Sequence, residues 1–200
     1  MRFDQCTNGN IFMHGWTKEQ AVMSDHDKAI LQELAKKMAA YAARPEEEAR
    51  IQLWRDHNDL KDTRPLIYID LENGWNELLP MEFTCQCEGE MAQEWEMWLH
   101  KELIYAEKIK CDKPIEAKFY IPYQAHNTMW GVEKKVIGDV KGGEAITWES
   151  PITDDMMEDD FDVKELIKIP QITIDWEATE AYTAIAHDVF DGILTVERRH

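Results

Sequence analysis

The chain of 200 residues has the length of one domain with an appendage, and 44% hydrophobic residues allow a sizeable core. Forty acidic residues against 22 basic residues give a formal net charge of −18, which argues against nucleic acid or an anionic membrane as partner. The chain has no apolar run of membrane-spanning length, no apolar signal-peptide core and only four cysteines, so we expect a cytoplasmic protein without a disulfide framework.

Residues 1–23 are expected to form a poorly structured extension, because they lack clear periodicity and contain the turn-forming Asn8-Gly9-Asn10. Met23 is our hypothesis for the natural start of the protein. Residues 24–62 are expected to form a helical arm of two helices. Ser24 is the predicted N-cap of the first helix, with Asp27 at the capping-box spacing, and Pro45 opens the second helix at its first position.

Strands and helices alternate in the remaining residues, 63–200, where a long helix is predicted at about residues 88–109 and another at Asp175–Asp191. Three buried strands are predicted at Pro65–Asp70, Pro114–Tyr123 and Gly192–Val196. Two short extended runs within residues 129–150 predict a β-hairpin insertion, and the acidic stretch Asp154–Asp162 is expected to be a solvated loop. Strands that alternate with helices indicate a parallel α/β sheet.

The number of predicted strands is small for a closed structure. A (β/α)8 barrel takes about 250 residues, and its strands each need a covering helix. The sequence therefore indicates either a small open sheet or the first part of a barrel, and we favour the incomplete barrel.

The series from Leu53 to Ile67 resembles the opening of uroporphyrinogen-decarboxylase-like proteins of anaerobic bacteria. In that family a helix with the pattern Trp-Arg-x-x-Asn-Asp-Leu, here Trp54 to Leu60, leads through Arg-Pro, here Arg64-Pro65, into the first barrel strand. Glu72-Asn73-Gly74-Trp75 is similar to the loop after that strand, and Ile115 to Tyr123 and Ile193 to Val196 are similar to the next strands. The resemblance covers residues 24 to the end and implies an N-terminal part of a TIM-type barrel.

The resemblance implies two kinds of activity. True members decarboxylate uroporphyrinogen without a cofactor, while related methyltransferases work with a corrinoid protein and activate a thiol on zinc. The decarboxylases carry arginines in the loop after the first strand, whereas residues 71–76 here contain no Arg or Lys. The family's zinc ligands belong to the back half of the barrel, so no cofactor is expected within these 200 residues. Cys85-Gln86-Cys87 is expected to hold structural thiols, because a lone Cys-x-Cys is a weak metal signal.

Active sites of α/β barrels lie at the carboxyl ends of the strands, and this rule selects the candidate residues. Carboxylates suit acid–base work, and amide, aromatic and basic side chains suit substrate binding. The expected catalytic residues are Asp70, Glu72, Glu116 and Glu197. The expected substrate-binding residues are Asn73, Trp75, Tyr123, His126 and Arg198.

Three functions remain open from the sequence. The first is methyl transfer from a small methylated compound, linked to a corrinoid protein. The second is decarboxylation of uroporphyrinogen or a related acid, and the third is a non-catalytic α/β module for binding or dimerisation. The expected partners are a small-molecule substrate and, for the first function, a corrinoid protein, while a homodimer is left open.

Overall fold

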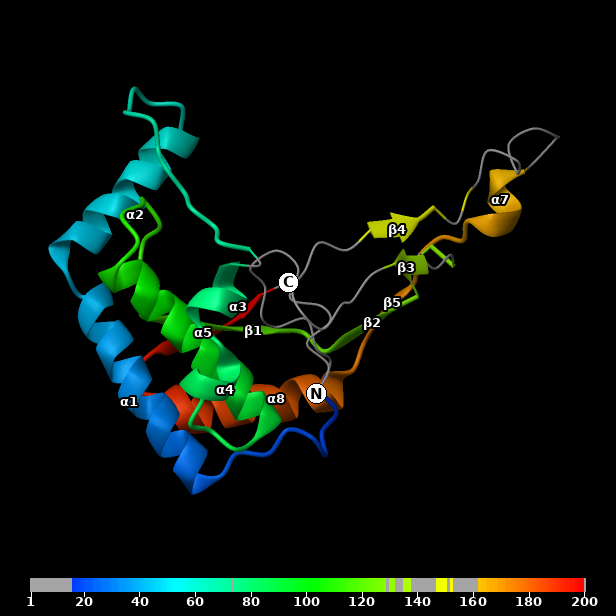
Figure 1. Ribbon diagram of the computed structural model, residues 1–200, viewed down its shortest axis with the longest axis horizontal. Helices are drawn as coiled ribbons and strands as arrows, with labels where there is room; N and C mark the ends of the chain where they lie inside the picture. The colour runs from blue at the N-terminus through cyan, green and yellow to red at the C-terminus, as the bar shows by residue number, and fades with distance from the viewer. Residues whose placement is uncertain are drawn as a thin grey trace.

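The computed structural model describes residues 16–72, 74–128, 130–131, 135–137, 147–150, 152 and 162–199, which form a mixed α/β fold (Figure 1). None of the helices in these residues is long and apolar enough to cross a membrane. The helices are α1 (Asp25–Ala42), α2 (Pro45–Asn58), α3 (Gly74–Leu78), α4 (Met81–Thr84), α5 (Glu90–Glu107), α7 (Val163–Leu166) and α8 (Trp176–Phe190). The strands are β1 (Lys118–Pro122), β2 (Ala125–Asn127), β3 (Lys135–Ile137), β4 (Thr147–Glu149), β5 (Ile172–Ile174) and β6 (Thr195–Arg199).

The two helices predicted within residues 24–62 are present as α1 and α2, and α1 is part of the core, with Leu31 and Ala35 fully buried. The Ser24 hydroxyl caps α1 by accepting a hydrogen bond from the Asp27 backbone N–H at 3.0 Å, and Pro45 occupies the start of α2. The Asp27 carboxylate, expected to complete a capping box, instead accepts from the backbone N–H groups of Glu88 and Gly89 at 2.8 and 3.1 Å. This side chain therefore ties the start of α1 to the start of α5.

The predicted strand Pro65–Asp70 is wrong. The segment is not part of a sheet, and Ile67 and Tyr68 are more than half exposed. Its hydrogen-bond partners lie in a loop and in the helix α5. The Ile67 carbonyl accepts from the Asp112 backbone N–H at 2.7 Å, the Ile67 N–H donates to the Asp112 carboxylate at 2.8 Å, and the Ile69 carbonyl accepts from the Tyr105 hydroxyl at 2.7 Å. These hydrogen bonds take the place of backbone pairing with another strand in the described residues, and the apolar side chains of the segment lie near the surface.

The central sheet in the described residues is the parallel pair β1–β6, in which Phe119 lies opposite Val196 and Tyr120 opposite Glu197. The second predicted strand is confirmed in shorter form as β1. The third begins later than predicted, because Gly192 adopts a left-handed φ of 82° in the turn after α8 and β6 starts only at Thr195. The described residues contain no closed barrel.

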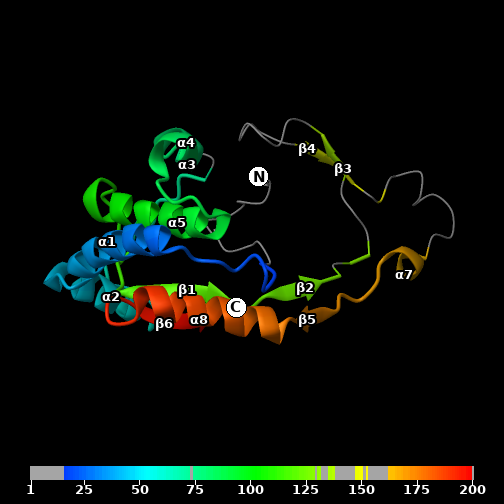
Figure 2. The same ribbon diagram turned by 90° about the horizontal axis from the view of Figure 1, so that it is seen from below.

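Helix α8 connects into this sheet and packs on it, as Figure 2 shows where α8 runs alongside β1 and β6. The predicted helix and its cap are confirmed, since the Asp175 carboxylate accepts from the Ala178 N–H at 2.9 Å. The core lies where α5, α8 and β1 meet. Trp95 is fully buried there, with ring centroids 4.9 Å from Phe119, 5.4 Å from Tyr182 and 5.6 Å from Phe190.

Two antiparallel ribbons extend away from the helices (Figure 1). The pair β3–β4 confirms the predicted hairpin insertion. The pair β2–β5 was not predicted, because its strands have three residues each and lie 45 residues or more apart in the sequence. Most of the predicted acidic loop, residues 154–161, and most of the predicted N-terminal extension lie outside the described residues.

Residues 16–23, the described part of that extension, are attached to the domain. The Trp16 backbone N–H donates to the Gln124 side-chain oxygen at 2.7 Å, and the Trp16 indole N–H donates to Glu94 at 3.3 Å. Trp16 also packs against the core. The segment of residues 16–23, which precedes α1, thus covers the N-terminal part of α5, where Glu94 lies.

From the buried Glu94 carboxyl we predict that the free energy of unfolding falls as the pH rises. Burial raises its pKa to about 7, helped by the charge of Glu90 and opposed by the bond from Trp16. An unfolded glutamate ionises near pH ~4.3, so between that pH and about 7 the unfolded chain loses a proton that the folded chain retains. The free energy of unfolding contributed by this group therefore declines through that interval.

We expect a Glu94→Gln chain to lose less stability than the native chain between about pH 5 and about pH 8, measured as the urea midpoint at each pH. Glu82→Gln, at an exposed carboxylate before α5, is the matched control and should follow the native chain. Parallel curves for the native and Glu94→Gln chains would contradict the prediction.

Candidate functional site

The two faces of the β1–β6 sheet carry different side chains. Phe119 and Ile121 are fully buried on the face that meets the helices. Because side chains alternate along a strand, Lys118 and Tyr120 point to the opposite face, and the parallel register adds Glu197 and Arg199 to it. We call these residues, together with Glu116 two residues before the start of β1, the polar face: Glu116, Lys118, Tyr120, Glu197 and Arg199.

Lys118 lies between the two carboxylates of the polar face. Its ammonium nitrogen is 3.0 Å from Glu197 Oε1 and 3.5 Å from Glu116 Oε1. The hydrogen bond with Glu197 raises the pKa of Lys118, so the amine is charged at neutral pH. The three side chains are each about one-third exposed, at 33 to 37%. A ligand can therefore reach a cation held between two anions, an arrangement able to orient a polar substrate or move a proton.

Tyr120 and Arg199 complete the polar face near the carboxyl ends of the strands. The Tyr120 hydroxyl donates to Glu116 at 3.2 Å. Burial raises its pKa to about 12, aided by the charge of Glu116, so the hydroxyl keeps its proton. The guanidinium carbon of Arg199 lies 3.6 Å from the centroid of the Tyr120 ring, a cation–π contact.

The polar face brings together two of the four expected catalytic residues, Glu116 and Glu197, through Lys118. Glu116 was expected inside a strand but precedes β1, where its carboxylate still reaches Tyr120 and Lys118. Arg198, expected to bind substrate, points the other way: it donates to Glu180 at 2.7 Å and to Thr183 at 3.0 Å, both on α8. The alternation of β6 places Arg199 on the polar face in its stead.

Asp70 and Glu72 lie apart from the polar face. Asp70 accepts from the Glu72 backbone N–H at 3.1 Å and from the Trp75 indole N–H at 3.3 Å. Both contacts lie at the start of α3. Figure 2 shows α3 on the far side of α5 from β1. Trp75 was expected in an open loop, but it lies in α3 with only 5% of its surface exposed and its ring edge against Tyr105. It is a core residue and presents no free ring face for a ligand to stack on.

Tyr123 and His126, two more of the expected residues, follow the carboxyl end of β1. Tyr123 is half-buried, with its ring centroid 5.8 Å from that of Trp176. His126 is exposed on β2, opposite Thr173 of β5. Asn73 lies outside the described residues.

Lys118, Tyr120 and Arg199 were missed from the sequence. The signal was present in Glu116-Ala117-Lys118-Phe119-Tyr120-Ile121, where polar and apolar side chains alternate. Reading β1 as fully buried concealed that one of its faces is polar.

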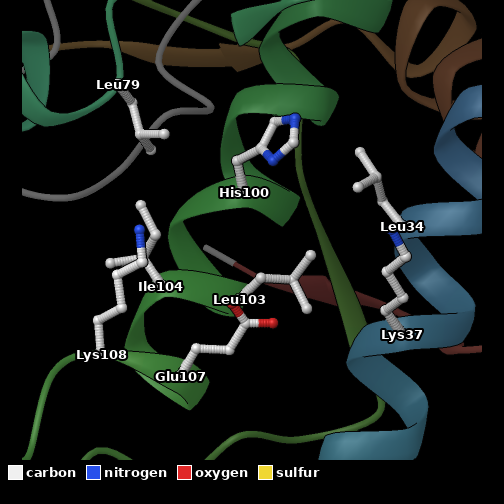
Figure 3. A pocket seen from close by; sticks show the side chains of 8 residues that line it. All are labelled: Leu34, Lys37, Leu79, His100, Leu103, Ile104, Glu107 and Lys108. Atoms are coloured by element: carbon white, nitrogen blue, oxygen red, sulfur yellow. The ribbon is translucent and has the colours of Figure 1, made fainter.

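A separate shallow pocket of about 280 Å³ lies between α1 and α5. Figure 3 shows His100 between Leu34 and Leu79, with Lys37 and Lys108 on opposite sides. The Nε2 atom of His100 is buried and lies 3.5 Å from the fully buried Glu96 carboxylate. None of the residues expected from the sequence lines this pocket.

The described residues contain no group of three or more His, Cys, Asp or Glu side chains placed to hold a metal ion. Cys85 and Cys87 are free thiols. Burial, with the nearby Glu96 charge, raises the pKa of Cys85 to about 12 and that of Cys87 still further. Without a metal ion beside them, these thiols therefore keep their protons at neutral pH and are not in the nucleophilic thiolate form.

No protein-family model, curated protein or solved structure was found to match this chain.

Proposed function

We propose that this chain is the front part of an α/β barrel enzyme of the uroporphyrinogen-decarboxylase-like type, which moves a methyl group from a small methylated compound with the help of a corrinoid protein. The observation that carries the proposal is the position of Lys118 between Glu197 and Glu116 on the polar face of a parallel strand pair. Helices cover the other face of that pair, as they cover the outside of a barrel. The polar face would then be part of the wall of the pocket.

The roles of the residues follow from their charges. Glu197 and Glu116 are the acid–base candidates, and Lys118 holds them in place while they exchange a proton with substrate. The Tyr120 hydroxyl, which keeps its proton, orients Glu116. Zinc, which would activate the thiol acceptor, would be bound by residues that follow this chain.

A decarboxylase of uroporphyrinogen or a related acid is the second candidate, because one observation favours it. Arg199 presents a guanidinium near the carboxyl ends of the strands, and guanidinium groups pair with carboxylates in a bidentate manner. The loop of residues 71–76 still supplies no arginine for the several carboxylates of a porphyrinogen.

The test uses the protein read through to its natural stop codon. We expect it to transfer methyl groups from methylcobalamin to a small thiol faster than the protein-free mixture does. Formation of coproporphyrinogen from uroporphyrinogen, without methyl transfer, would replace the first proposal by the second. Absence of both activities would reject both enzymatic proposals.

A further inference from the structure

Arg199 lies over the Tyr120 ring on the polar face. It lies opposite Pro122 at the end of β6, and its guanidinium carbon is 3.6 Å from the centroid of the Tyr120 ring. At this distance the guanidinium carbon contacts the face of the ring, and a guanidinium stacked on an aromatic ring can still donate from its N–H edge. The side chain is exposed, so a ligand can approach that edge.

The charged side chains next to Arg199 form their ion pairs with other residues and not with its guanidinium. Lys118 is the cation that contacts Glu197 and Glu116, and Arg198 pairs with Glu180 on the opposite face. Within the described part of the chain Arg199 forms no ion pair, although the sequence has 40 acidic residues against 22 basic ones. An arginine without a carboxylate partner in so acidic a chain is suited to an anion from outside the protein.

We infer that the substrate carries a carboxylate that pairs with Arg199, an inference that rests on the proposed function of the polar face. A carboxylate matches the two parallel N–H donors of the guanidinium. Phosphate fits less well, because its greater charge would be repelled by Glu197 and Glu116 on the same face. The methyl-bearing end of the substrate would then lie toward Lys118 and the two glutamates.

The experiment compares two small probes that share a methylthio group. (Methylthio)acetate carries a carboxylate, and 2-(methylthio)ethanol carries a hydroxyl group in its place. We expect the protein, read through to its natural stop codon, to bind the carboxylate about ten-fold more tightly than the alcohol in an NMR titration.

Arg199→Gln should remove this preference, while Arg198→Gln, one residue away on the opposite face, should retain it. Both variants are checked by thermal unfolding, and a second exchange, Arg199→Lys, should keep part of the preference because it keeps the charge. No binding of the carboxylate, equal binding of both probes, or a preserved preference in Arg199→Gln overturns the inference.

The binding result is independent of turnover. If the protein prefers the carboxylate but transfers no methyl group, the inferred ligand stands and the proposed reaction is rejected. A protein that transfers methyl groups without preferring the carboxylate keeps the reaction and rejects the inferred ligand.

Discussion

Replacing Trp95 by alanine should lower the free energy of unfolding by about 3–5 kcal/mol, measured by urea denaturation. The indole is fully buried and contacts the rings of Phe119, Tyr182 and Phe190. Its N–H also donates to the Tyr182 hydroxyl at 2.8 Å, so the substitution leaves both a cavity and a buried hydroxyl without this donor. Since a domain of this size is stable by about 5–15 kcal/mol, the substitution would remove a large fraction of the total stability.

Trp176→Ala is the control for this prediction. Trp176 is 55% exposed at the start of α8 and contacts Tyr123 by a ring edge. We expect it to lower the free energy of unfolding by less than about 1 kcal/mol. Comparable losses in the two variants would mean that the core is not organised around Trp95.

Glu197→Gln should lower kcat/KM for methyl transfer by about 10²–10⁴-fold in the protein read through to its stop codon. The amide cannot exchange a proton, and it also loses the charge that attracts Lys118 from 3.0 Å away. The fold should survive, because Glu197 is about one-third exposed and makes no contribution to the core. The measurement is the rate of methylation of a thiol by methylcobalamin, with the thermal unfolding temperature recorded beside it.

Glu180→Gln is the matched control for the catalytic prediction. Glu180 also pairs with a basic residue of β6, but that residue is Arg198 and the contact lies on the α8 side of the sheet. We expect its rate of methyl transfer to stay close to that of the native protein. Equal losses of rate in Glu180→Gln and Glu197→Gln would assign the effect to the stability of β6. An unchanged rate in Glu197→Gln would remove Glu197 from the catalytic candidates.

The sequence predicted the helices better than the strands, for physical reasons. The caps at Ser24 and Asp175 and the proline at the start of α2 are local signals, and local signals decide where helices begin. Strand pairing depends on a partner distant in the sequence. The segment Pro65–Asp70 has the composition of a strand, yet its hydrogen bonds go to Asp112 in a loop and to Tyr105 in α5, and none pairs it with another strand in the described residues.

The candidate site was predicted in part. Glu116 and Glu197 were expected from their positions near strand ends, and the structure brings both to Lys118. The alternation from Glu116 to Ile121 indicates that β1 has one polar face, but which residues of β6 join that face depends on the pairing of β1 with β6, and the sequence does not show this pairing. Arg198 and Arg199 could not be told apart for the same reason.

The register of β6 makes the length of the turn at Gly192 matter for function. Successive residues of a strand point to opposite sides, so adding one residue between Phe190 and Thr195 would shift every later side chain to the other side. Arg198 would then take the place of Arg199 over Tyr120, and Glu197 would face α8. Which side chains of β6 lie on the polar face therefore depends on whether the number of residues between Phe190 and Thr195 is odd or even. Insertions or deletions of a single residue in this turn should be far less tolerated than substitutions there.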